Sequence, residues 1–187
     1  MTTSVASVAR PAINAKRVGA AVAGVALVAL GAQAAIPIPG NPVPITLQVP
    51  AVLIVGGLLG PALGSASLAL YLLLGATGLP VFAPTGTTVG LLRLFGPTGG
   101  YLLAYPVAAA VAGLAGRRTG WAGLIAGLVA AVAVIHLGGV AQLAILGGDL
   151  SIAWRLGSLP FLLGDFLKIL LACLVIRRLG TKTRALL

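Results

Sequence analysis

Long apolar runs, separated by short polar or proline- and glycine-rich stretches, make up most of the chain. Positions within a run are apolar on every face, without the alternation of apolar and polar residues that marks a strand of a membrane barrel. Uninterrupted runs of this kind are typical of α-helices that cross a bilayer. We therefore predict six transmembrane helices, at about 18–36, 49–59, 63–79, 101–115, 121–146 and 159–176, with the second starting near Ile45.

The composition strengthens this interpretation. Of the 187 residues, 59% are hydrophobic and 7% are charged, whereas a soluble domain carries roughly 25% charged residues. So few charges cannot cover a surface that faces water. The sequence predicts an all-α, multi-pass integral membrane protein whose outer surface is solvated by lipid.

The basic residues set the predicted orientation. Six helices place both termini on one side of the membrane, together with the turns at 60–62 and 116–120. That side holds nine of the twelve Lys and Arg residues, the other side holds Arg93 and Arg155, and Lys168 lies inside a helix. The positive-inside rule then puts both termini in the cytoplasm. The predicted organisation is a cytoplasmic tail (1–17), a six-helix domain (18–178) and a basic cytoplasmic tail (179–187).

Residue types that carry catalysis or bind metals are scarce. The chain has two acidic residues, one histidine and one cysteine, so we expect neither an enzyme, nor a metal site, nor a bound cofactor. The net charge of +10 does not indicate nucleic-acid binding, because the charges flank apolar runs instead of forming a basic face. We interpret His136, inside the fifth run, as a buried, hydrogen-bonded or neutral histidine. A proton relay is the alternative.

Two long loops lie on the predicted outer side. Four prolines between Pro37 and Pro44 exclude a regular helix in the first loop. The second loop runs from Pro80 to about Thr98 and contains Arg93. Irregular backbone beside a membrane must be wet or covered by protein. We therefore expect the first loop to fold back over the helices.

One ion pair inside an apolar helix suggests a binding site. Asp165 and Lys168 are three residues apart, so a helix places them on one face. Each charge costs roughly 2.5–3.5 kcal/mol at a helix centre in a bilayer, whereas an exposed helical pair returns only roughly 0.3–0.5 kcal/mol. Mutual pairing alone is the alternative explanation, and it leaves this cost uncompensated. We therefore predict that the pair serves a ligand.

Other polar and aromatic residues are expected at the same outer end. The predicted site residues are Asp165, Lys168, Arg93, Gln48, Thr46, Tyr101, Thr98 and Phe82, with Tyr105 as a further aromatic wall. Together they offer a carboxylate, cations, amide and hydroxyl groups and aromatic rings. Such a set suits a small, partly apolar ligand with polar groups at both ends.

Small residues four apart give the first helix a smooth face. The spacings are Gly19-x-x-x-Ala23 and Ala20-x-x-x-Gly24. Such residues allow another helix to approach closely. These four positions are candidates for docking a partner protein, and packing within the chain is the alternative.

Several of these segments together resemble the BioY family, the biotin-specific substrate-binding (S) components of energy-coupling-factor (ECF) vitamin transporters. The resemblance covers roughly residues 20–178. It rests on Ile36-Pro37-Ile38-Pro39, Pro42-Val43-Pro44-Ile45-Thr46-Leu47-Gln48, Leu58-Leu59-Gly60-Pro61, the segment 70–83, Gly96-Pro97-Thr98-Gly99-Gly100-Tyr101-Leu102 and Gly164-Asp165-Phe166-Leu167-Lys168. The segment 83–88 departs from the glycine-rich form of this loop in the family.

The resemblance implies a six-helix S component in the bacterial plasma membrane, with a biotin pocket near the outer surface. It implies that Asp165 accepts hydrogen bonds from the ureido N–H groups of biotin and that Lys168 or Arg93 meets the valerate carboxylate. It also implies that the first helix docks on a transmembrane coupling protein, which in turn sits on two ATP-hydrolysing subunits. Two other functions are kept as alternatives: a self-sufficient carrier in which His136 or Asp165 cycles a proton, and an assembly subunit without a ligand.

Overall fold

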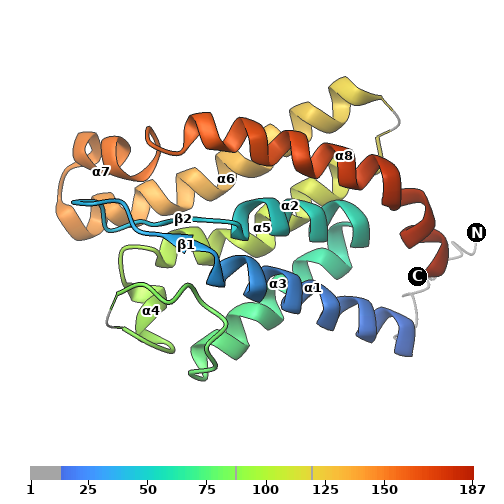
Figure 1. The fold of residues 1–187 in the computed structure, drawn as a ribbon, viewed down its shortest axis with the longest axis horizontal. Coiled ribbons are helices and arrows are strands. Elements are labelled where there is room, and N and C mark those ends of the chain that lie inside the picture. Colours follow the sequence, from blue (N-terminus) through green and yellow to red (C-terminus); the bar gives the residue numbers. More distant parts are fainter. Residues whose placement is uncertain (1–13, 87, 119) are drawn as a thin grey trace, which may run out of the picture.

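The protein is a bundle of α-helices with one short β-hairpin (Figure 1). The computed structural model describes residues 14–86, 88–118 and 120–187, so most of the predicted tail 1–17 lies outside the described residues. The elements are α1 (Ala15–Gln33), β1 (Ala35–Ile36), β2 (Ile45–Thr46), α2 (Gln48–Leu59), α3 (Pro61–Ala76), α4 (Leu92–Phe95), α5 (Gly99–Ala115), α6 (Trp121–Gly147), α7 (Leu150–Gly157) and α8 (Leu162–Leu186).

Each of the six apolar runs forms a helix, which confirms the all-α class. The predicted start of the second helix near Ile45 is wrong, because Ile45 pairs with Ile36 in the antiparallel hairpin β1–β2 and α2 begins at Gln48. The last helix is longer than the sixth run, since α8 continues to Leu186 through the segment predicted as the basic tail 179–187. Lys and Arg are good helix formers, so the end of the apolar run does not end the helix.

Two short helices lie in segments that the hydrophobic pattern assigned to loops. Asp149 caps α7 by accepting hydrogen bonds from the backbone N–H groups of Ser151 (2.7 Å) and Ile152 (3.0 Å). The four-residue helix α4 carries Arg93 in the second outer loop. The helix α4 is too short to produce a periodic signal in the sequence.

The lengths of the helices differ widely. In the described residues, α1 and α6 are each long and apolar enough to cross a bilayer, and α7 with α8, bent by 50°, qualifies as one broken span. The apolar helices α2, α3 and α5 are shorter. Large apolar side chains are strongly exposed on the outside of the bundle, including Ile145 (82%) and Leu163 (84%). Such a surface suits lipid better than water.

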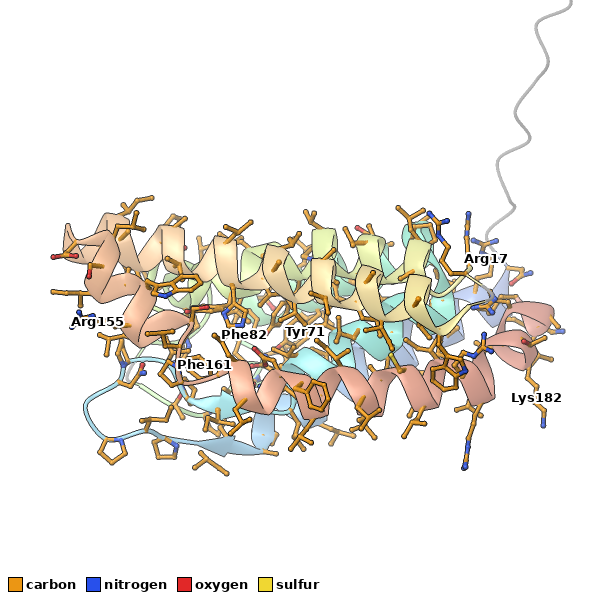
Figure 2. The ribbon with its side chains drawn as sticks, turned by 90° about the horizontal axis from the view of Figure 1, so that it is seen from above. Arg17, Tyr71, Phe82, Arg155, Phe161 and Lys182 are labelled. Atoms are coloured by element: carbon orange, nitrogen blue, oxygen red, sulfur yellow. The ribbon has the colours of Figure 1, made fainter. Side chains whose placement is uncertain are left out.

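The two long loops lie at the opposite end of the bundle from the start of α1 and the end of α8. The hairpin loop, α4 and α7 lie at one end, whereas α1 begins and α8 finishes at the other (Figure 1). Figure 2 shows Arg17 and Lys182 at the end where α1 begins, and Arg155 at the end that carries α7. The two ends are called the basic end and the loop end below.

Small residues bring the central helices close together. A side chain on Gly100 of α5 would collide with the backbone of Gly138 of α6, and a side chain on Gly138 would collide with Gly100. Gly56 of α2 lies in the same way against Ala109 of α5. Close backbone approach of this kind holds helices together where lipid offers no hydrophobic drive for association. These close contacts hold α2, α5 and α6 in fixed positions relative to one another.

Candidate functional site

A cavity near the loop end brings together all the side chains that the sequence nominated for a binding site. Its lining includes Asp165 and Lys168 of α8, Arg93 of α4, Gln48 of α2, Thr46 of β2, Tyr101 of α5, Thr98 just before α5, Phe82 of the second outer loop, and Tyr105 of α5. These residues come from parts of the chain as far apart as Thr46 and Lys168. Their convergence is a property of the fold, and whether they bind a ligand stays a prediction.

A charged cluster forms one wall of the cavity. The Lys168 ammonium donates to Oδ1 of Asp165 at 2.9 Å, and Nε2 of His136 lies 2.6 Å from Oδ2 of Asp165. The Asp165 side chain is 5% exposed, whereas those of Lys168 and His136 are 11% and 12% exposed. Each oxygen of the Asp165 carboxylate thus has a nitrogen partner. The cavity therefore holds a fixed anion with one cation beside it.

A chain of hydrogen bonds supports Gln48, which also lines the cavity. The Gln48 amide donates to the Tyr71 hydroxyl (2.7 Å), which donates to the backbone carbonyl of Val81 (2.9 Å). Thr46 donates from its hydroxyl to Oε1 of Gln48 at 3.2 Å. This chain ties the start of α2 to α3 and to the second outer loop. It holds Gln48 in one orientation toward the cavity.

Arg93 holds the second outer loop against the bundle. Its guanidinium donates to the carbonyl of Ala83 (3.2 Å) and to the hydroxyl of Thr85 (2.9 Å), and also to the carbonyl of Thr85. Arg93 is only 6% exposed. These acceptors are neutral oxygens, so no opposite charge offsets the guanidinium in these contacts. The segment 83–88, which departs from the family pattern, thus supplies acceptors for Arg93.

Aromatic rings complete the cavity. Figure 2 shows Phe82 and Phe161 toward the loop end, with Tyr71 beside them in this view and further along the bundle. The rings of Tyr71 and Phe82 meet edge to face with centroids 5.4 Å apart. The Tyr101 hydroxyl donates to the carbonyl of Gly157 at 2.6 Å, and the Tyr101 ring occupies the space that a side chain on Gly139 would fill. The aromatic walls are therefore set by packing and do not depend on a ligand.

Several polar atoms of the cavity have no partner within the described residues. Four buried side-chain polar atoms lack a hydrogen bond: Arg93 Nε, Thr98 Oγ1, His136 Nδ1 and Ser158 Oγ. Three of them belong to residues that line the cavity. Buried polar atoms in folded proteins are nearly always paired. Unpaired atoms gathered in one cavity are what a site awaiting a polar ligand would present.

A second, outer cavity adjoins the first. It lies between the first and second outer loops and shares Pro44, Arg93 and Thr98 with the inner cavity. Asp165 and Lys168 line only the inner one. The shared residues lie at the boundary between the two cavities.

Sequence reasoning did not nominate three residues that shape the site. His136 was interpreted as a buried, hydrogen-bonded or neutral histidine; it is half-buried and in hydrogen-bond contact with Asp165, but its place in the cavity was not predicted. Its rarity was the available signal, since it is the only histidine in the chain and lies inside an apolar run. Tyr71 and Phe161 carried no signal that set them apart from packing aromatics.

The four docking candidates on α1 differ in how exposed they are. Gly19 and Ala23 are exposed, and Ala20 is half-buried. Gly24 is buried, and a Cβ there would lie 3.0 Å from Val55 Cγ1 of α2. Gly24 therefore packs α1 against the bundle. The row Gly19–Ala23 is the part that faces outward.

Fold and site together define a class: helical membrane proteins that enclose a small polar and aromatic cavity near one end of the bundle. The model of the BioY family matches residues 2–185. The chain belongs to the BioY family.

Named relatives and a solved structure agree with this assignment. A "Probable biotin transporter BioY" of Pyrococcus horikoshii is 40% identical over 91% of this chain and 100% of its own length. The "Biotin transporter BioY" of Thermotoga maritima is 40% identical over 82% of this chain and 89% of its own length. These names describe transport and not catalysis.

The structural comparison extends to the whole bundle. A crystal structure described as the "S-component for biotin from an ECF-type ABC transporter" superposes with a TM-score of 0.79 at 28% identity. The match covers 90% of this chain and 94% of that one. The fold of this chain is thus that of an S component, and the chain is a membrane protein.

Proposed function

We propose that this protein captures biotin at the outer face of the bacterial plasma membrane, as the S component of an ECF-type transporter. Its relatives in the BioY family are named biotin transporters. The observation that carries the proposal is the inner cavity, where the charged cluster, Arg93 and unpaired polar atoms meet aromatic walls. Biotin has a ureido ring with N–H donors at one end and a carboxylate at the other, so it matches this arrangement.

The charges of the cavity suit a ligand with one carboxylate. Arg93 and Lys168 supply two positive charges, and Asp165 supplies one negative charge. A single carboxylate would therefore balance the remaining charge, and a buried charge is tolerated only when it is paired. A neutral ligand would leave Arg93 without a counter-ion.

The position of the two cations suggests the orientation of the ligand. Lys168 is already paired with Asp165, whereas Arg93 contacts only neutral oxygens. We place the valerate carboxylate at Arg93, at the boundary with the outer cavity, and the ureido ring at Asp165. Asp165 retains lone pairs that can accept the ureido N–H groups. Phe82, Tyr101 and Tyr105 then flank the apolar part of the ligand.

The proposed topology has six membrane spans with both termini in the cytoplasm. It is supported by the basic residues at the end where α1 begins and α8 finishes. In this topology the outer cavity opens away from the cytoplasm. The exposed row Gly19–Ala23 of α1 is the proposed docking face for a transmembrane coupling protein, which would connect the S component to two ATP-hydrolysing subunits.

The test is binding of biotin by the purified protein in detergent or nanodiscs, measured by calorimetry against a panel of other vitamins. We expect one site per chain and tight binding of biotin alone. Absence of biotin binding, or equal binding of thiamine or riboflavin, would overturn the proposal.

One observation favours a second candidate, a carrier that works without a coupling protein. His136 and Asp165 are in hydrogen-bond contact beside the cavity, and such a pair can pass a proton. Proteoliposomes that contain only this chain separate the two functions. Biotin uptake driven by an imposed pH gradient would favour the carrier, whereas uptake that requires added coupling and ATP-hydrolysing subunits would favour the S component.

A further inference from the structure

His136 links two helices through the carboxylate of the proposed site. It lies on α6, and its Nε2 atom is 2.6 Å from Oδ2 of Asp165 on α8. Lys168, also on α8, holds the other oxygen of Asp165 at 2.9 Å. Each oxygen of the carboxylate is therefore fixed by a separate donor, and only the donor on Oδ2 comes from a neighbouring helix.

The hydrogen-bond partners of the imidazole define which nitrogen carries the proton. An ionised carboxylate only accepts hydrogen bonds, so Nε2 must be the donor. Nδ1 is buried and has no partner within the described residues. The arrangement thus specifies that Nε2 carries a proton and donates it to Asp165.

Rings on both sides hold the imidazole in this position. The Tyr101 ring meets it edge to face at 6.5 Å between centroids, and the Phe161 ring lies 6.4 Å away. The charged and titratable groups that face it are Asp165 and Lys168 from α8 and Tyr101 from α5. A ring confined in this way cannot turn without leaving Asp165. It acts as a fixed donor, whereas Lys168 is attached through a flexible side chain.

The effect of a fixed donor on Asp165 is geometric. A carboxylate held only by Lys168 can rotate about its terminal torsion, which is broad in Asp side chains. A second donor from α6 stops this rotation and leaves one lone pair on each oxygen aimed elsewhere. Preorganised acceptors bind a ligand more tightly because less freedom is lost on binding.

We propose that His136 is a positioning residue for ligand recognition. It fixes the orientation of the Asp165 carboxylate so that the carboxylate oxygens accept hydrogen bonds from the N–H groups of the ligand. The inference rests on the proposed function, since it assumes a ligand with N–H donors at Asp165. In this role His136 acts through Asp165. It is expected to control selectivity for N–H groups more than affinity for the carboxylate end.

The first experiment compares two variants with different donors. His136→Gln keeps an N–H donor on an atom that is as many bonds from the backbone as Nε2, whereas His136→Leu removes the donor. We expect His136→Leu to weaken biotin binding about tenfold or more, the effect of losing one charge-assisted hydrogen bond. His136→Gln should stay within a few-fold of the unmodified protein. Leu137→Ala, the adjacent position with a 69% exposed side chain, is the matched control and should bind normally.

Ligand selectivity separates positioning from general damage. Each variant is also titrated with biotin methylated on a ureido nitrogen. The unmodified protein should prefer biotin strongly, His136→Leu should lose most of that preference, and His136→Gln should restore it. Equal loss of affinity for both ligands, with the preference unchanged, would overturn the inference.

The single histidine allows a test that needs no substitution. With 15N-labelled histidine and no histidine tag, the imidazole of His136 gives the only histidine ring signals of the chain. We expect the pattern of a ring that carries a proton on Nε2, and a shift when biotin is added. A ring without a proton on Nε2, or signals indifferent to saturating biotin, would contradict the inference. Failure of the unmodified protein to bind biotin would instead reject the proposed function.

Discussion

Arg93 and Lys168 line the same cavity, yet only Lys168 has a carboxylate beside it. The Lys168 ammonium lies 2.9 Å from Asp165, whereas Arg93 donates to the backbone of Ala83 and to the hydroxyl of Thr85. One cation is thus neutralised within the protein and the other is not. We therefore expect Arg93 to bind the carboxylate of the ligand, while Lys168 stays paired with Asp165.

Replacement of Asp165 by Asn should weaken biotin binding by about 3 kcal/mol, because it removes a buried acceptor and leaves Lys168 unpaired. That corresponds to roughly a hundredfold increase in Kd. Calorimetric titration of the purified variant measures the change. Asp149→Asn is the matched control, since Asp149 is the only other acidic residue of the chain and is an exposed cap of α7. Unchanged affinity in Asp165→Asn would remove Asp165 from the site.

Replacement of Arg93 by Gln should reduce the preference for a ligand with a free carboxylate. The unmodified protein is expected to bind biotin more tightly than biotin amide by about 1.5–3 kcal/mol, the range for a hydrogen bond to a charged group. In Arg93→Gln the two ligands should bind alike. Arg155→Gln, at an exposed arginine of the same end, should leave the preference intact. A preference that survived in Arg93→Gln and vanished in Lys168→Gln would reverse the proposed orientation of the ligand.

The hydrophobic pattern predicted the helices because bilayer-spanning segments are uniformly apolar, and Asp165 and Lys168 stood out because charges are rare in such segments. The pattern did not predict α7, which depends on the local cap formed by Asp149. It also did not reveal that Asp165 contacts His136, because that contact joins residues 29 positions apart through packing of α6 on α8. Tyr71 was missed for the same reason, since its partners lie on α2 and in the second outer loop.

Tyr71→Phe should destabilise the fold and weaken binding together. The change removes the hydroxyl that connects Gln48 to the carbonyl of Val81, and Tyr71 is fully buried. The buried Gln48 amide, left without this partner, costs about 1–3 kcal/mol. Thermal unfolding in detergent, with and without biotin, measures both effects. Tyr105→Phe is the control for stability, because the Tyr105 hydroxyl makes no hydrogen bond to the described residues. An equal loss of stability in both variants would contradict the role given to the Gln48–Tyr71 contact.

The six-span topology predicts opposite accessibility for the two ends of the bundle. Cys173 is buried and is the only native cysteine, so a Cys173→Ala background allows single new cysteines to be labelled. In intact cells, Arg155→Cys should react with a membrane-impermeant maleimide, and Lys182→Cys should react only after the membrane is opened. The reverse pattern would invert the orientation. Labelling of both cysteines in intact cells would place the end of α8 outside the cell and would contradict the proposed topology.

The exposed row on α1 predicts a variant that binds biotin but does not transport it. A Cβ on Gly19 would meet no atom within 4 Å, so Gly19→Leu should leave the thermal stability and the biotin affinity unchanged. It should nevertheless block close approach of a partner helix at this position. The measurement is biotin uptake by proteoliposomes that contain the protein together with coupling and ATP-hydrolysing subunits. Gly24→Leu is the contrasting variant, because its side chain would collide with Val55. This variant should lower the thermal stability of the protein itself. If Gly19→Leu and Ala23→Leu both supported normal uptake, the partner would have to dock on another face of the bundle.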